Sequence, residues 1–231
     1  MDRRAAEFLI AGVVTVASVF FLSGCAGTPS VEDRRFEQFG QAGRVQTALI
    51  VGDLEAARRP AAWLAEHDGL AELGSEAQPW AERIRTASSE VEQATSIGEA
   101  ADATGRIADA CAGCHTAADQ GPRFRSSGPA DDASEGAHMV QHLWAMDRMW
   151  IGLVAPDDAM WRSGAAAIAD REPSDAFPGG TATAALAEAV HAQAARARDV
   201  SVDERGAAYA EMIKGCASCH AVVGAGDHTV R

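Results

Sequence analysis

Two short motifs of the same form hold the residues best suited to chemistry in this chain. The first reads Cys-Ala-Gly-Cys-His over residues 111–115, and the second reads Cys-Ala-Ser-Cys-His over residues 216–220. Residues three and four positions apart share one face of a helix, so both thiols and the histidine project together. This pattern is typical of covalent haem attachment, and it predicts two haem c groups. The predicted attachment and iron-binding residues are Cys111, Cys114 and His115 for the first haem, and Cys216, Cys219 and His220 for the second.

Three other interpretations of the cysteine pairs are weaker. A four-cysteine zinc site usually has its pairs about 15 to 20 residues apart, whereas these pairs are 105 residues apart. Disulfides within each pair would not require a histidine after the second cysteine. A thioredoxin-like site needs a βαβ pattern, which this sequence does not contain.

The composition predicts that helices position these motifs. Aromatic residues make up only 6% of the 231 residues, and Tyr209 is the sole tyrosine. Strand-forming residues are therefore scarce, while alanine and other helix formers dominate. We expect an all-α protein.

An internal duplication organises the chain. A shift of 104 residues aligns Leu49 with Leu153 and Asp53 with Asp157, and a shift of 105 aligns the two haem motifs. The second shift also aligns Ser96 with Ser201, each of which begins a Ser-x-x-Glu capping box 15 residues before the first haem cysteine. A capping box starts a helix, so a helix is expected to run into each motif.

Each repeat is predicted to form four helices. Short loops between amphipathic helices favour an up-down-up-down bundle, a fold that often holds a cofactor between its helices. The sequence therefore predicts two tandem four-helix bundles with one covalent haem each. The expected helices are 31–50, 53–67, 79–94 and 96–115 in the first half, and 137–154, 157–170, 182–199 and 201–220 in the second.

The predicted domain boundaries follow the same division. Residues 1–24 are expected to be a lipoprotein signal peptide, and 25–117 the first haem-binding bundle. Residues 118–135 are rich in Gly, Pro, Ser and Asp and are expected to be a linker. Residues 136–231 are expected to form the second bundle.

A four-helix module with its Cys-x-x-Cys-His motif near the end of the last helix resembles the cytochrome c-prime family, including its low-spin relatives. The resemblance covers residues 26–117 and 136–225. It implies that a residue of the first helix covers the distal face of each haem, and that its identity decides whether the iron has an open position. The family's usual Tyr and Arg after the motif are absent here, where Thr116 and Ala221 follow the two histidines. The resemblance also implies dimerisation through the first helices, a contact that the duplicated chain could instead satisfy internally.

The sixth iron ligand is expected to differ between the halves. The first helix of the second half carries His138 and His142, with Met139, Met146 and Met149 on the same face as His142. A histidine buried beside a haem either binds iron or needs another polar partner, which makes His142 the first candidate, ahead of His138. A methionine of this stripe and an open site are the alternatives, because methionine is often core filler. We expect His67, His191 and His228 to lie on the surface or in loops.

The first half lacks these groups. Arg34, Arg35, Gln38, Ala42 and Val45 stand at the matching positions. Phe36 and Phe39 are placed to cover the iron with apolar rings. The first haem is therefore expected to be five-coordinate or to take a ligand from outside its own half. A five-coordinate haem in an apolar pocket binds small gases, whereas a six-coordinate one mainly moves electrons.

The N-terminus predicts export and lipidation. Arg3 and Arg4 precede an apolar run over residues 8–22, which is short for a spanning helix. The tetrad Leu-Ser-Gly-Cys at 22–25 resembles a bacterial lipobox. It implies cleavage before Cys25 and attachment of a lipid to its sulfur; an uncleaved membrane anchor is the alternative. Either way the protein is expected in the cell envelope, facing the periplasm or cell exterior.

Charge and motifs together favour an electron-transfer protein rather than an enzyme. The net charge of -13 repels phosphate backbones, so nucleic-acid binding is not expected and a redox partner with a basic face is favoured. The alternative function is binding or sensing of nitric oxide or carbon monoxide at the first haem. A peroxidase would need a distal general acid or base, for which Arg34 and Arg35 are ambiguous candidates.

Overall fold

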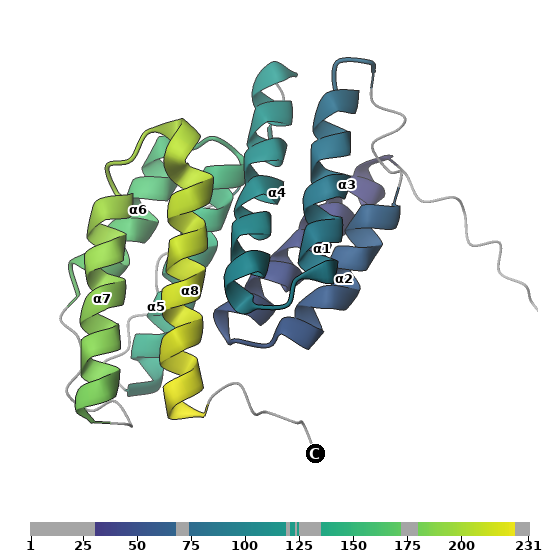
Figure 1. Ribbon diagram of the computed structural model, residues 1–231. Coiled ribbons are helices and arrows are strands. Elements are labelled where there is room, and N and C mark those ends of the chain that lie inside the picture. The colour runs from purple at the N-terminus through teal and green to yellow at the C-terminus, as the bar shows by residue number, and fades with distance from the viewer. Residues whose placement is uncertain are drawn as a thin grey trace, which may run out of the picture.

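The computed structural model describes residues 31–67, 74–118, 121–122, 124, 135–171 and 180–224. These residues form eight α-helices and one 3-10 turn and contain no strand, which confirms the all-α prediction (Figure 1). The first four helices are α1 (Val31–Ile50), α2 (Leu54–Glu66), α3 (Gln78–Gln93) and α4 (Ile97–Ala117). The second four are α5 (Glu135–Val154), α6 (Asp158–Ala169), α7 (Thr181–Ala197) and α8 (Arg205–Val223), with the 3-10 turn η1 (Val202–Glu204) before α8.

Side-chain caps start the helices at equivalent places in both halves. Asp53 accepts a hydrogen bond from the Ala56 amide at the start of α2, and Asp157 accepts one from the Met160 amide at the start of α6. Ser201 and Glu204 form a complete capping box. At the start of α4, Ser96 accepts from the Glu99 amide, but the Glu99 carboxylate turns back to Thr95 instead. Each cap satisfies amides that have no partner within the helix.

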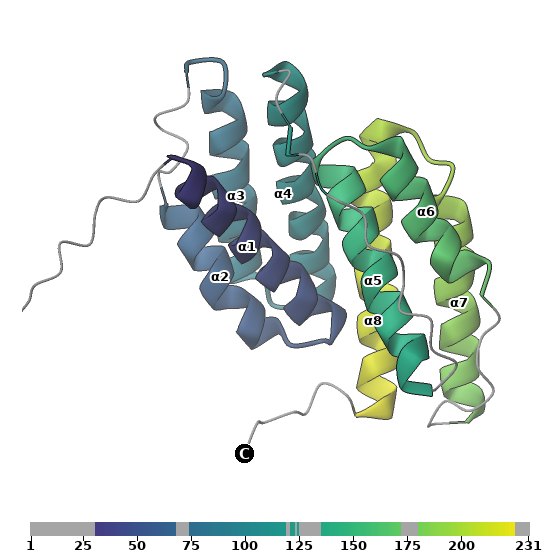
Figure 2. The same cartoon turned by 180° about the vertical axis from the view of Figure 1, so that it is seen from behind.

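Helices that follow one another in the chain pack against one another. α1 packs on α2, α2 on α3 and α3 on α4, and the same order holds from α5 to α8. The first and last helices of each group also meet, α1 with α4 and α5 with α8. In the view from behind, α1 and α5 both lie on the face of the molecule toward the viewer (Figure 2).

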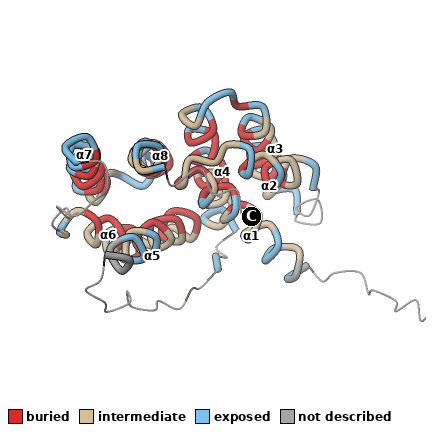
Figure 3. The backbone as a smooth tube through the Cα atoms, turned by 90° about the horizontal axis from the view of Figure 1, so that it is seen from below, coloured by how far each residue is buried: buried red, intermediate tan, exposed pale blue. Residues whose placement is uncertain are grey.

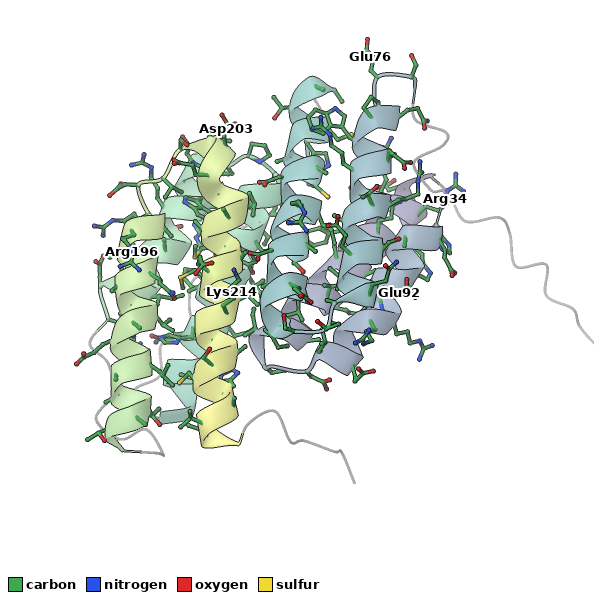
Figure 4. The ribbon with its side chains drawn as sticks, viewed as in Figure 1. Arg34, Glu76, Glu92, Arg196, Asp203 and Lys214 are labelled. Atoms are coloured by element: carbon green, nitrogen blue, oxygen red, sulfur yellow. The ribbon has the colours of Figure 1, made fainter. Side chains whose placement is uncertain are left out.

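The closest contact between the halves joins α4 and α8, which run in opposite directions (Figure 1). Gly105 and Gly206 allow this approach, because a β-carbon at Gly105 would collide with the main-chain oxygen of Gly206. Lys214 extends from α8 and forms an ion pair of 2.7 Å with Asp102 of α4 (Figure 4). Since both haem motifs lie near helix C-termini, the antiparallel pairing puts them at opposite ends of the α4–α8 pair.

One hydrophobic core runs through both halves. Buried residues from α1 to α4 and from α5 to α8 belong to a single cluster, and Figure 3 shows buried backbone where helices face one another. Val45, Leu49 and Ile107 from the first half pack into this cluster with Trp150 and Tyr209 from the second. The two repeats therefore share one core. Most of the predicted linker lies outside the described residues.

Candidate functional site

The first haem motif occupies the last turns of α4. Cys111, Cys114 and His115 are all partly buried there, and no disulfide joins the two cysteines. Burial raises the pKa of the Cys111 thiol to about 12, and it also raises the pKa of Cys114. Both groups are therefore thiols at neutral pH. A reactive redox cysteine needs the thiolate form instead.

The second motif has the same setting at the end of α8. Burial raises the pKa of Cys216 to about 12 and also raises that of Cys219. The two cysteine pairs do not converge. Within the described ranges, no three His, Cys, Asp or Glu side chains gather as a metal-ion site. The geometry thus gives the four-cysteine zinc alternative no support.

His115 is oriented by the opposite half of the molecule. Its Nδ1 lies 2.8 Å from the main-chain oxygen of Val154, the last residue of α5. Because a carbonyl oxygen only accepts, Nδ1 carries the proton and Nε2 keeps its lone pair. Burial lowers the pKa of His115, the Val154 carbonyl opposes that effect, and the Arg35 guanidinium adds to it. A neutral imidazole with a free Nε2 lone pair and its Nδ1 held by a carbonyl is the form in which histidine binds metals.

His220 has a similar but less complete setting. Burial lowers its pKa, and the main-chain oxygen of Ile50, the last residue of α1, acts in the opposite direction. Its Nδ1 is buried and makes no hydrogen bond of ordinary geometry within the described part of the chain. The two motif histidines therefore face the ends of the first helices of each other's halves.

A cavity of about 1630 Å³ lies beside the first motif. Protein pockets for small molecules are usually about 300 to 1,000 Å³, so this one has room for a group as large as a porphyrin. The motif side chains line one part of it, and the α1 wall contributes Phe36, Phe39 and Ala42. The turn between α5 and α6 closes the cavity from the second half. The residues that fit a haem here are thus Cys111, Cys114 and His115, inside a mainly apolar enclosure.

The two halves differ at two equivalent interior positions. Ala42 of α1 stands where α5 has Met146, and Ile107 of α4 stands where α8 has Met212. Both methionines are buried, at 1% and 0% exposure. The second half therefore has buried thioether side chains at two positions where the first half has alanine and isoleucine.

The interior of the second half brings the predicted His142 next to a histidine that was not predicted there. His142 is half-buried, and its ring centroid lies 5.4 Å from that of His191 on α7. The prediction that His191 lies on the surface is wrong, because the side chain is 7% exposed. The sequence around His191 could have predicted its burial. Ala187, Val190, His191 and Ala194 follow the three- and four-residue spacing of a buried helix face.

Other predicted residues are placed as follows. Met146 and Met149 are buried, whereas Met139 is 37% exposed. Phe36 and Phe39 both line the first cavity, although Phe36 is 68% exposed. Phe39 packs against Phe124, with ring centroids 5.0 Å apart. Met160 of α6 also lines this cavity. It follows the α5–α6 turn that begins after Val154, whose residues also line the cavity.

Several predictions fall outside the described residues. These are the signal peptide, Cys25, His228, most of the linker and the side chain of His138, which lies in the first turn of α5. His67 is exposed at the end of α2, as expected, and stacks on Trp63. Among the described helices, none has the length and hydropathy needed to cross a membrane.

No family model matches this chain, and neither a curated protein nor a solved structure matches it.

Proposed function

We propose that the chain is a dihaem c-type cytochrome, similar to the cytochrome c-prime family, that carries electrons outside the cytoplasm from a lipid tether. The setting of His115 is the observation that supports this most strongly. Its Nδ1 is held by the Val154 carbonyl, and Cys111 and Cys114 line the same large cavity. A haem c held there would supply an iron that gains and loses one electron at a time.

The residues of this chain would have distinct tasks. Cys111 and Cys114 would hold the group through thioether bonds, and His115 would bind iron through Nε2. The carbonyl of Val154 keeps the imidazole in one orientation and in the tautomer that leaves Nε2 free. The apolar walls limit water, which is one of the factors that set a haem potential. Cys216, Cys219 and His220 would act in the same way at the end of α8.

Electron transfer ranks above peroxidase activity for this site. A peroxidase needs a general acid or base poised over an open iron. On the α1 wall of the cavity the ionisable groups are Glu32 and Arg35, and both are exposed. Neither is enclosed in the interior, where a proton donor would be isolated from bulk water.

Covalent haem content tests the proposal directly. The full chain would be produced in a host that matures c-type cytochromes, then analysed by intact mass and by the alkaline pyridine spectrum. We expect two covalent haems per chain. Replacing Cys111 and Cys114 by Ser should remove one haem, and replacing Cys216 and Cys219 should remove the other. Cys25→Ser is the matched control, because it should remove the lipid and keep both haems. A chain that matures without covalent haem would refute the proposal.

The acidic surface supports a partner with a basic face. With a net charge of -13, docking to such a partner should weaken as salt screens the interaction. Electron exchange with a basic mitochondrial-type cytochrome, used as a probe, should therefore slow as ionic strength rises. A rate that is independent of salt would argue against electrostatic docking.

A second candidate function is binding of nitric oxide or carbon monoxide by the first haem. The α1 wall presents Phe36, Phe39 and Ala42 to the cavity, none of which binds iron. Met160 is the thioether in the lining, and it follows the α5–α6 turn that begins after Val154. Since Nε2 of His115 points away from Val154, we propose that Met160 packs behind the imidazole and leaves the sixth position open.

Carbon monoxide distinguishes the two functions. One high-spin haem that binds one equivalent of gas per chain would favour binding or sensing. Two low-spin haems indifferent to the gas would favour electron transfer alone. Met160→Leu decides whether the thioether is a ligand. If wild type ignores the gas and Met160→Leu binds it, the first haem takes its sixth ligand from the second half.

A further inference from the structure

Two buried aromatic rings lie between the two proposed haem sites. Trp150 of α5 is 2% exposed and Tyr209 of α8 is fully buried. Their ring centroids are 5.6 Å apart and the ring planes meet at 41°. This is within the range of direct aromatic contact.

Each ring also belongs to one of the two sites. Trp150 lines the large cavity together with Cys111 and His115. Tyr209 lies on α8 seven residues before Cys216, on the same helix face. Both side chains belong to the same buried core cluster. The contact between the rings thus connects the cavity at the end of α4 with the cysteine pair at the end of α8.

Three helices hold the tyrosine in place. Its hydroxyl donates to Oε1 of Gln46 on α1, and it lies 3.2 Å from the main-chain oxygen of Met146 on α5. The Gln46 amide in turn donates to Asp147 at 3.2 Å. Burial raises the pKa of Tyr209 well above its ordinary value, so the phenol keeps its proton. A buried ring fixed by several hydrogen bonds has a single orientation.

We propose that Trp150 and Tyr209 form the path by which an electron passes between the two haems. This inference rests on the proposed function. With both groups bound, one electron would leave the reduced haem, which would become oxidised, and would arrive at the oxidised haem, which would become reduced. No bond forms or breaks and no proton moves. An external redox protein supplies and removes the electron. Contiguous packed atoms carry a tunnelling electron better than a gap does, and this pair bridges the two sites.

The test follows the electron directly in the holoprotein. A pulse of photochemical reductant places one electron on each molecule, and absorbance then records its redistribution between the two haems. Trp150→Leu and Tyr209→Leu remove one ring each, and each should slow redistribution by at least about tenfold. Tyr209→Phe keeps the ring and should leave the rate close to wild type.

Controls separate a path from a loosened core. Trp161→Leu removes another buried indole, which is not part of the Trp150–Tyr209 contact and whose Nε1 donates to the Ala197 oxygen at 2.8 Å. This change should not slow redistribution. Haem content, spin state and both reduction potentials are measured for every variant, so a change in driving force is recognised. If Trp150→Leu fails to fold, Trp150→Phe replaces it, because phenylalanine keeps an aromatic ring. Trp150→Phe should slow redistribution less than Tyr209→Leu does.

The outcomes are distinct. Unchanged redistribution in Tyr209→Leu with both haems in place would overturn the path and leave the proposed function intact. Equal slowing by Trp161→Leu would also overturn it, because the effect would then be general. Wild-type protein without two haems would instead refute the proposed function itself.

Discussion

Nδ1 of His115 lies 2.8 Å from the main-chain oxygen of Val154, so the motif histidine of the first half rests on the last residue of α5 in the second half. In the same way, the motif histidine of the second half, His220, faces Ile50, the last residue of α1 in the first half. Each repeat thereby completes the surroundings of the other's motif. A change at the α5–α6 turn should therefore affect the proposed first haem, even though its attachment residues lie on α4.

His142 is expected to be the sixth ligand of the second haem. His142→Ala should convert that haem from low spin to high spin in the oxidised EPR spectrum, because no imidazole remains on this face of α5 among the described side chains. His142→Met should keep the haem low-spin and raise its reduction potential, since a Met/His pair raises the potential of a haem.

His191→Phe is the companion variant for this assignment. It keeps a ring beside His142 but removes the second imidazole. The second haem should stay low-spin in this variant. A low-spin signal that survives His142→Ala and disappears with His191→Phe would make His191 the ligand instead.

Tyr209→Phe should lower the free energy of unfolding by about 1 to 3 kcal/mol, because it leaves a buried amide oxygen of Gln46 without its donor. Urea unfolding followed by circular dichroism measures the loss. Gln46→Leu in the same background removes the stranded oxygen. The double variant should therefore lose less than the sum of the two single variants. Strict additivity would show that the hydrogen bond contributes nothing.

Asp147→Asn should stabilise the protein at neutral pH more than at acid pH. Burial raises the pKa of Asp147, and the hydrogen bond from Gln46 only partly opposes this. A carboxyl with a raised folded-state pKa binds its proton more tightly when folded. The protonated carboxyl therefore adds its full contribution to the free energy of unfolding below its ordinary pKa. That contribution is lost as the pH rises through the pKa of the folded state.

The comparison for Asp147 uses urea unfolding at about pH 4 and about pH 7.5. The gain from Asp147→Asn should be larger at the higher pH. Glu188→Gln, at an exposed position of α7, should show no such dependence. An equal gain at both pH values would mean that the carboxyl is not destabilised by burial.

Gly105→Ala should destabilise the α4–α8 contact by about 1 to 3 kcal/mol, since the added carbon would collide with the Gly206 backbone. Gly40→Ala is the matched control on α1, where a β-carbon would have no neighbour within 4 Å. That change should stabilise the helix by about 0.5 to 1 kcal/mol. Thermal unfolding compares the two, and equal effects would contradict the close approach of α4 and α8.

The sequence alone determined the helices well. The eight expected helices match the observed ones to within a few residues, because caps such as Asp53 and Asp157 and the apolar spacing between them are local signals. The haem motifs are also local, since spacing along one helix turn decides which side chains can reach a porphyrin.

Only the tertiary structure decided how the repeats meet. The pairing of α4 with α8, the support of His115 by Val154 and the bond from Tyr209 to Gln46 join residues far apart in the chain. The sequence pattern does not predict such contacts. Every residue has a backbone carbonyl, and a glycine can accept any close neighbour, so neither shows which helix will pack against it. The contact of His191 with His142 was likewise decided by the tertiary structure, since a helix pattern shows which face is apolar but not which helix packs against it.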